Sequence, residues 1–202
     1  MAKRTPKQSQ HESQTPQPAD AVQILKADHR QIRKLFDQFR AAAAEDKAPL
    51  AARLFVLLDV HGRVEEELVY AAVRAGMETA DSVQANGASD RDDEGDDGEM
   101  APLDGVELDL PEEDDESDEL VAAAYESHQI VRDLIQQLRS IEPHRDDFRE
   151  LFDELEEIVT EHVAEEESEI LPLLADGFDI HALGAELQRR KDELTSRSSL
   201  AA

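Results

Sequence analysis

The sequence of 202 residues contains no cysteine and no tryptophan, and it has only two tyrosines and six phenylalanines. Without cysteine the chain can form neither disulfide bonds nor thiolate metal sites. Strand-forming residues are scarce and helix-forming residues are abundant, which predicts an all-α protein. No apolar run approaches the roughly 20 residues of a membrane span, and no hydrophobic stretch follows the basic N-terminus as it would in a secretory signal. We therefore expect a cytoplasmic protein.

Basic residues are also few, since 21 Lys and Arg face 49 Asp and Glu and the net charge is −28. This charge argues against nucleic acid or an anionic membrane as a partner, because both bind through clustered Lys and Arg. Residues 81–119 alone hold eighteen acidic residues and one basic residue, Arg91. We interpret this segment as a solvated linker that buries too little apolar surface to fold, with the collection of cations as the alternative. Residues 1–18, which are polar and contain three prolines, are predicted to be a disordered tail.

Four segments carry apolar residues at intervals of three and four and are predicted to be helices. They run from Ala19 to about 39, from Pro49 in a first turn to about 72, from Ser117 or Asp118 to about 138, and from just after Pro143 to Asp176-Gly177. The predicted domain is a helical bundle over residues 19–176, interrupted by the acidic linker at 81–117. Residues 177–202 are expected to add a short helix, which docks on the bundle, and a tail.

The second half of the chain repeats the first. DHRQIRKLFDQFR, from Asp28, aligns with SHQIVRDLIQQLR, from Ser127, and HGRVEEELVY, from His61, aligns with HVAEEESEIL, from His162. The two histidines of each half are 32 and 34 residues apart, which places them at one level of an antiparallel hairpin. We predict an antiparallel up-and-down four-helix bundle made of two repeated helical hairpins.

One histidine lies in the middle of each apolar stripe, and these four are His29, His61, His128 and His162. In the second and fourth helices a glutamate follows at i+4, Glu65 and Glu166, which returns to within roughly 40° of the same face. His11, His144 and His181 lie in the tail or at helix boundaries and are assigned no role.

Each of these glutamates belongs to a run of three, Glu65–Glu67 and Glu165–Glu167. Only positions +4 and +5 after the histidine are acidic in both halves, and +5 lies roughly 140° round the helix, towards solvent. The inward-facing pair is therefore predicted to be Glu65 and Glu166, with Glu66 and Glu167 as surface charges.

Four imidazoles and two carboxylates at one level of a bundle match a site for two metal ions, each with two nitrogen ligands and both sharing the carboxylates. Mixed nitrogen and oxygen donors suit iron or manganese, and zinc is a further option. The alternative is a buried network without metal, in which Arg33 and Arg132, at +4 from His29 and His128, pair with the glutamates. Tyr125, one turn before His128, is open to three roles: metal ligand, hydrogen-bond donor or core residue.

The pattern H, H-x-x-x-E, H, H-x-x-x-E resembles that of the hemerythrin superfamily, specifically its His-His-Glu (HHE) cation-binding members. The resemblance covers about residues 20–176 apart from the acidic insert. It implies a di-iron centre, and manganese or zinc are the less favoured alternatives to iron. The metal ligands implied are His29, His61, Glu65, His128, His162 and Glu166. Ligands of this centre would be oxygen, hydrogen peroxide or nitric oxide.

One departure bears on function. Oxygen-carrying hemerythrins have a second histidine one turn after the histidine of the third helix, and this chain has Arg132 there. One nitrogen ligand fewer disfavours a dedicated reversible oxygen carrier. The expected function is reaction with oxygen or peroxide in oxidative-stress defence, with catalase-like peroxide decomposition as the candidate activity. The alternative is a non-catalytic sensor of oxygen, nitric oxide or iron, or an iron buffer.

Overall fold

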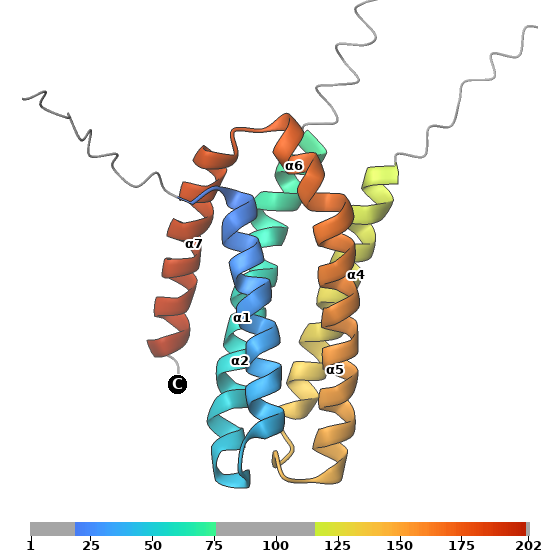
Figure 1. Cartoon of the computed structure of the whole chain (residues 1–202), viewed down its shortest axis with the longest axis vertical. Helices are drawn as coiled ribbons and strands as arrows, with labels where there is room; N and C mark the ends of the chain where they lie inside the picture. The colour runs from blue at the N-terminus through green and yellow to red at the C-terminus, as the bar shows by residue number, and fades with distance from the viewer. Residues whose placement is uncertain (1–18, 76–115, 201–202) are drawn as a thin grey trace, which may run out of the picture.

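The computed structural model describes residues 19–75 and 116–200, and no strand occurs among them, which confirms the all-α class (Figure 1). The elements are α1 (Ala21–Ala41), α2 (Ala44–Val64), the π-helical turn η1 (Glu65–Val69), α4 (Glu116–Leu138), α5 (Asp146–Glu165), the π-helical turn η2 (Glu166–Ile170), α6 (Leu171–Gly177) and α7 (Ile180–Leu200). Helix continues after η1 to residue 75. The predicted tail 1–18 and residues 81–115 of the predicted linker lie outside the described residues.

Two antiparallel hairpins, α1 with α2 and α4 with α5, stand side by side with their loops at the same end of the molecule (Figure 1). The loops are short, so each second helix runs back along the first. Asp20 begins the first hairpin as the N-cap of α1, because its side chain accepts a hydrogen bond of 2.8 Å from the Gln23 backbone N–H. The predicted up-and-down bundle of two repeated hairpins is confirmed.

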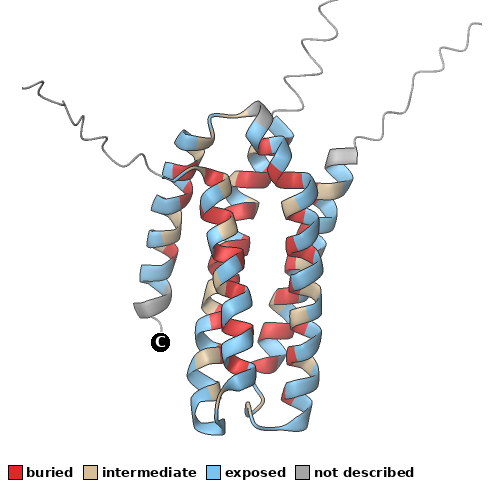
Figure 2. Ribbon diagram, in the orientation of Figure 1, coloured by how far each residue is buried: buried red, intermediate tan, exposed pale blue. Residues whose placement is uncertain are grey.

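The buried residues lie mainly on the sides of the helices that face one another (Figure 2). The apolar ones form two separate clusters. The cluster nearer the loops contains five phenylalanines, among which the ring centroids of Phe39 and Phe152 lie 4.0 Å apart. The other cluster joins the opposite ends of the helices to α6 and α7. The level between the two clusters is occupied by buried polar residues, so any site there is shielded from bulk water on both sides.

Two predicted boundaries are wrong. Helix α2 begins at Ala44, so Pro49 lies inside it rather than in its first turn. The helix tolerates this because acids at Glu45 and Asp46 suit its first turn, and proline removes one hydrogen bond near the helix start. Helix α4 begins at Glu116, one or two residues before the predicted start at Ser117 or Asp118, so residues 116–117 of the predicted linker belong to the bundle.

The C-terminal helix α7 is not short as predicted, because it has 21 residues, the same number as α1. It packs along α1 and α2 (Figure 1), with Leu187 and Leu194 buried against them. Gly184 permits the approach, because a Cβ atom there would lie 2.5 Å from the carbonyl oxygen of Ala19. The docking predicted for this helix is therefore confirmed, and the contact is close enough to exclude a side chain.

Both return helices change to a π-helical turn at the same place, four residues after the histidine. In η1 the Tyr70 N–H bonds to the carbonyl of Glu65, and in η2 the Leu171 N–H bonds to that of Glu166. Pro172 is not the cause, because the first hairpin makes the same turn with Ala71 at the corresponding position. π-Helical turns concentrate at functional sites because they change which side chains face inward.

None of the helices in the described part of the chain is long and apolar enough to cross a membrane.

Candidate metal centre

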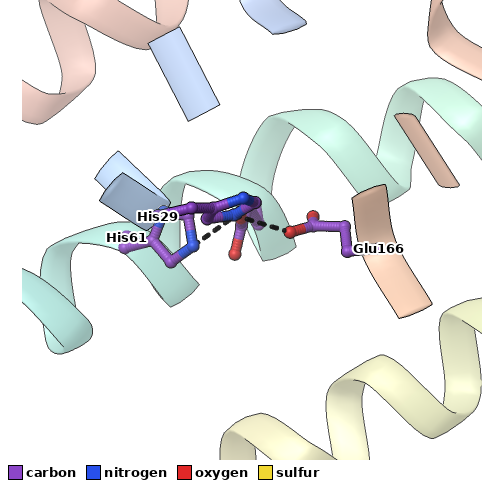
Figure 3. Close-up of side chains that lie close together, drawn as sticks. His29, His61 and Glu166 are labelled. Atoms are coloured by element: carbon purple, nitrogen blue, oxygen red, sulfur yellow. Dashed lines mark ion pairs between the residues drawn. The ribbon is translucent and has the colours of Figure 1, made fainter. Parts of the chain in front are cut away.

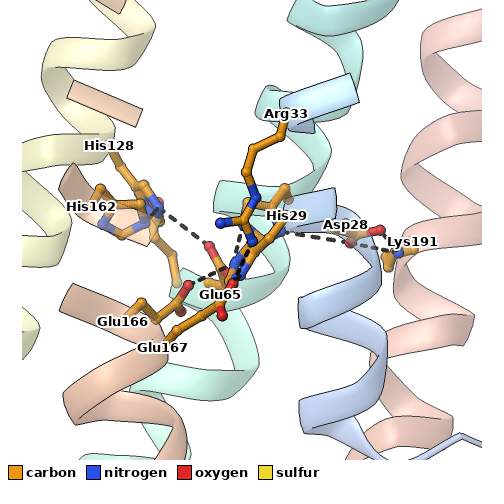
Figure 4. A network of polar contacts seen from close by, with 11 residues as sticks. Asp28, His29, Arg33, Glu65, His128, His162, Glu166, Glu167 and Lys191 are labelled. Atoms are coloured by element: carbon orange, nitrogen blue, oxygen red, sulfur yellow. Dashed lines mark hydrogen bonds and ion pairs between the residues drawn. The ribbon is translucent and has the colours of Figure 1, made fainter. Parts of the chain in front are cut away.

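The six residues predicted as metal ligands all meet at the polar level between the two apolar clusters (Figure 4). α1 and α4 contribute His29 and His128, and the C-terminal ends of α2 and α5 contribute the other two histidines. Glu65 and Glu166 open the two π-helical turns and are completely buried. The i+4 spacing therefore brings each histidine and its glutamate to the same interior point, as the sequence predicted.

The first group of potential ligand atoms joins His29, His61, Glu65 and Glu166. The Nε2 atom of His61 lies 3.0 Å from Oε1 of Glu65, and Nε2 of His29 lies 3.1 Å from Oε2 of Glu166. Glu166 comes from the opposite hairpin and faces the two histidine rings (Figure 3). These four residues offer two nitrogen and two carboxylate donors to one cation.

The second group joins Glu65 to His128 and His162. Oε2 of Glu65 lies 3.3 Å from Nε2 of His128, and the Nε2 atoms of the two histidines lie 3.1 Å apart. Glu65 is thus shared by both groups, whereas Glu166 belongs to the first alone. The sequence predicted two equivalent carboxylates shared by both metal ions, whereas in the structure only Glu65 lies in both groups of potential ligands.

Six of the donor atoms that face the interior lack hydrogen-bond partners among the described residues. Among the described residues, both carboxylate oxygens of Glu65, both of Glu166, and Nε2 of His29 and of His61 are buried without a hydrogen bond of acceptable geometry. Buried polar atoms are otherwise almost always paired, because each unpaired one costs free energy. Oxygen and imidazole nitrogen converging on two points in this way fit one metal cation at each point.

The glutamates at +5 are not simple surface charges, which corrects the sequence interpretation. Glu167 accepts a hydrogen bond of 2.9 Å from Nδ1 of His29, and Glu66 accepts one of 3.1 Å from Nδ1 of His128. Because a carboxylate only accepts, Nδ1 carries the hydrogen in both rings, and Nε2 is left to face the interior. Each +5 glutamate therefore holds a histidine of the other hairpin in the tautomer and orientation that a metal ligand needs.

The two arginines of the repeat complete these contacts. Arg33 donates to Glu167 at 2.7 Å, and Arg132 donates to Glu66 at 2.6 Å. Both arginines thus pair with the outer glutamates and not with the buried pair, so the arginine network considered as the alternative to a metal site is absent from the described residues.

Burial and the neighbouring charges shift the pKa values of the buried histidines and of Glu166 strongly. Burial lowers the pKa of His29, but hydrogen bonds to Glu166 and Glu65 outweigh it and raise the pKa to about 9. Burial likewise lowers the pKa of His61, and the charge of Glu65 raises it to about 10. Burial and the neighbouring His128 lower the pKa of His162 to about 3. Burial and the charge of Glu65 raise the pKa of Glu166 to about 7. The carboxylates therefore attract cations to the His29–His61 side of the site, where a metal ion would compete with protons.

Two tyrosines lie beside the centre. Tyr125 donates from its hydroxyl to the backbone carbonyl of Glu66 at 3.1 Å, so it supports the π-helical turn as a hydrogen-bond donor. Tyr70 is fully buried, stacks on His128 at 5.7 Å between centroids, and its hydroxyl has no hydrogen-bond partner among the described residues. Burial and the charges of Glu65 and Glu166 raise its pKa, so the phenol stays protonated. Sequence reasoning missed Tyr70 because its counterpart in the repeat is the apolar Leu171.

Small cavities lie on both sides of the centre, at positions related by the repeat. Between α2 and α4 a cavity of about 20 Å³ is lined by Gly62, His128 and Arg132. Between α1 and α5 a larger one of about 240 Å³ is lined by Arg33 and Val163, which correspond to Arg132 and Gly62. The first cavity reaches a histidine of the centre directly and has room for a molecule of about the size of water.

The remaining histidines lie away from the centre. His144 is exposed in the loop before α5, and His181 is exposed in the first turn of α7. His11 lies outside the described residues.

A helical bundle whose two hairpins present paired His–Glu motifs to one buried point defines a metal-binding, hemerythrin-like class of protein. The chain matches the family model of the hemerythrin HHE cation-binding domain over residues 20–122 and over residues 105–174, so it belongs to that family. The predicted resemblance is confirmed.

The fold is shared with a solved structure, that of a hemerythrin HHE cation-binding domain-containing protein from Mycobacterium kansasii. The TM-score is 0.62 at 19% sequence identity, and the alignment covers 89% of each chain. Comparison with curated proteins gave no match.

Proposed function

We propose that the protein holds two iron ions between its hairpins and reacts with oxygen or hydrogen peroxide in oxidative-stress defence. In this proposal His29, His61, Glu65 and Glu166 hold one ion, and Glu65, His128 and His162 hold the other. The observation that carries it is the shared position of Glu65, whose two oxygens face histidines of different hairpins. A carboxylate so placed is suited to bridge two ions.

The donor set suits iron, and manganese or zinc are the alternatives that it leaves open. All six ligands are imidazole or carboxylate, thiolate is excluded, and the family is one of cation-binding domains. Iron would supply Lewis acidity and the electron transfer that reactions of oxygen and peroxide require.

The protein's own residues would confine and orient such a reaction. The two apolar clusters exclude bulk water above and below the centre, so charges there act in a low-dielectric environment. Glu66 and Glu167 keep the rings of His128 and His29 fixed. The second position has one carboxylate fewer and adjoins the cavity beside Gly62, where only a very small molecule fits. Oxygen, nitric oxide and hydrogen peroxide are of that size.

The activity that we test first is peroxide decomposition, in which two molecules of hydrogen peroxide give two of water and one of oxygen. Iron-loaded protein should evolve oxygen in an oxygen electrode at a rate well above that of the same concentration of free iron. Replacement of His128 or Glu166 by alanine should abolish this excess, and His144→Ala should not. Equal rates for loaded protein and free iron would reject peroxide turnover.

The alternative is a non-catalytic sensor of oxygen, nitric oxide or iron, or an iron buffer. Its support is that every ligand group draws on both hairpins, so metal binding would clamp the two together. A visible spectrum that changes reversibly with oxygen or nitric oxide, without turnover, would favour the sensor. Uptake of many more than two iron ions per chain would favour the buffer.

A further inference from the structure

A third outer carboxylate, that of Asp28, faces His61, and its cation comes from the C-terminal helix. Lys191 of α7 donates to Oδ1 of Asp28 at 2.6 Å, and Oδ2 of Asp28 faces Nδ1 of His61 at 3.6 Å. The ammonium group of Lys191 also lies 2.6 Å from Oδ2 of Asp28, so the carboxylate that faces His61 is already paired with a cation. Nδ1 of His61 has no hydrogen bond among the described residues, and Oδ2 of Asp28 is the carboxylate oxygen that faces it. The order cation, carboxylate, imidazole repeats that of Arg33–Glu167–His29, whose residues are labelled in Figure 4. It also repeats that of Arg132–Glu66–His128.

This third set breaks the symmetry of the repeat. The counterpart of Asp28 in the second hairpin is Ser127, which cannot form an ion pair. Its histidine, His162, has no carboxylate within ion-pair distance among the residues that the structure describes. The first group of ligands thus has both of its histidines oriented by a carboxylate, and the second group has one.

The ion pair between Lys191 and Asp28 is largely buried. Only 10% of the Asp28 side chain and 16% of the Lys191 side chain are exposed. Asp28 is the sole ion-pair partner of Lys191 within the described chain. Contacts away from the centre hold α7 in place: Gly184 against the backbone of Ala19, and Leu187 in the apolar cluster. The helix is therefore seated independently of the metal ligands and delivers its ammonium group to a defined point.

We propose that Lys191 is a positioning residue, which through Asp28 orients His61 and makes the first metal position bind more tightly than the second. This inference rests on the proposed two-metal centre. Its physical basis is that an imidazole held at Nδ1 by a charged acceptor presents Nε2 in a fixed direction as a stronger donor. Loss of such an outer partner typically weakens metal binding by about 10- to 100-fold.

The test is a titration of metal-free protein with Co²⁺, followed by its visible absorption in competition with a chelator. The wild type should bind two ions, the first more tightly. Lys191→Met should weaken the tighter step by about 10- to 100-fold and leave the weaker step within about threefold. Equal weakening of both steps, or no change in either, would overturn the inference.

The matched control is Arg190→Met, one residue away on α7. Arg190 pairs with Glu67 on η1 and with Glu193, so its loss removes a charge and a contact between α7 and the bundle without touching Asp28. It should change neither binding step by more than about threefold. If Arg190→Met reproduces the selective loss, docking of α7 matters and Lys191 has no special role.

A second measurement separates positioning from general loosening of α7. In zinc-loaded protein with ¹⁵N-labelled histidine, Lys191→Met should shift the Nδ1 signal of His61 and leave that of His162 in place. Arg190→Met should leave both signals in place, because it weakens the contact between α7 and η1 without removing the cation beside Asp28. An unchanged His61 signal in Lys191→Met, or the same shift in Arg190→Met, would also overturn the inference. If the wild type binds fewer than two ions, the two-metal proposal itself fails, and that result is distinct from the others.

Discussion

The carboxylate of Glu65, on the first hairpin, reaches across the bundle to His128 on the second, with Oε2 and Nε2 3.3 Å apart. Its other oxygen lies 3.0 Å from Nε2 of His61 on its own helix. This one side chain therefore connects the two groups of donors and the two halves of the repeat.

Replacement of single histidines should lower the metal content only when the histidine belongs to the centre. His61→Ala and His162→Ala should lose most of the bound metal, because each removes one of the few nitrogen donors of its group. His11→Ala, His144→Ala and His181→Ala should keep it. Elemental analysis of purified protein measures the outcome, and full metal content in both His61→Ala and His162→Ala would reject the assigned site.

Replacement of the four glutamates by glutamine should weaken metal binding to three different degrees. Glu65→Gln should reduce binding of both ions, since Glu65 belongs to both groups, whereas Glu166→Gln should reduce binding of one. Glu66→Gln and Glu167→Gln remove only the outer hydrogen-bond acceptors of His128 and His29, so two ions should still bind, about 10- to 100-fold more weakly. Metal titrations of the four variants test the order. Complete metal loss in Glu66→Gln or Glu167→Gln alone would show that the +5 carboxylates are ligands.

Metal binding should release protons. The carboxylates hold the pKa of His29 at about 9 and that of His61 at about 10, so both rings are protonated at neutral pH when no metal competes. A metal ion binds the neutral imidazole, so metal affinity should rise with pH until these values are passed. Calorimetric titration with Zn²⁺ in buffers of different ionisation enthalpy counts the protons, and we expect more than one per chain. Heats that do not depend on the buffer would contradict the prediction.

The same raised pKa values stabilise the metal-free fold. Because they lie above the unfolded value of about 6.5, their contribution to the free energy of unfolding is fully present below that pH. It is lost as the pH rises through about 9 to 10. Denaturant titrations of metal-free protein between neutral and alkaline pH would detect this loss.

The acidic insert should be dispensable for the centre. Replacement of residues 81–115 by a short Gly/Ser linker leaves every residue of both ligand groups in place, so metal content and helicity should be unchanged. Circular dichroism and elemental analysis provide the measurement. Loss of the helical signal would show that the insert has a structural role.

The periodicity of the sequence was sufficient to predict which histidines and glutamates meet in the interior of the bundle. His61 and Glu65 are four residues apart on one helix, and the 3.6-residue turn places both on one face whatever the tertiary structure. The duplicated pattern then implied a second, similar hairpin and hence the bundle. The same local reasoning failed for Glu66 and Glu167, because it considered the angle around one helix and not the neighbouring helix that meets the side chain there.

The sequence by itself therefore determined the helices, the repeat and the six inner residues, because these depend on short-range spacing along the chain. Only the tertiary structure decided which carboxylate is shared, since Glu65 and Glu166 are equivalent in the repeat and differ in what packs around them. It also decided the outer contacts, such as that between Asp28 and Lys191, which are 163 residues apart in the chain. Such contacts depend on where α7 docks, and no periodicity within a single helix encodes that position.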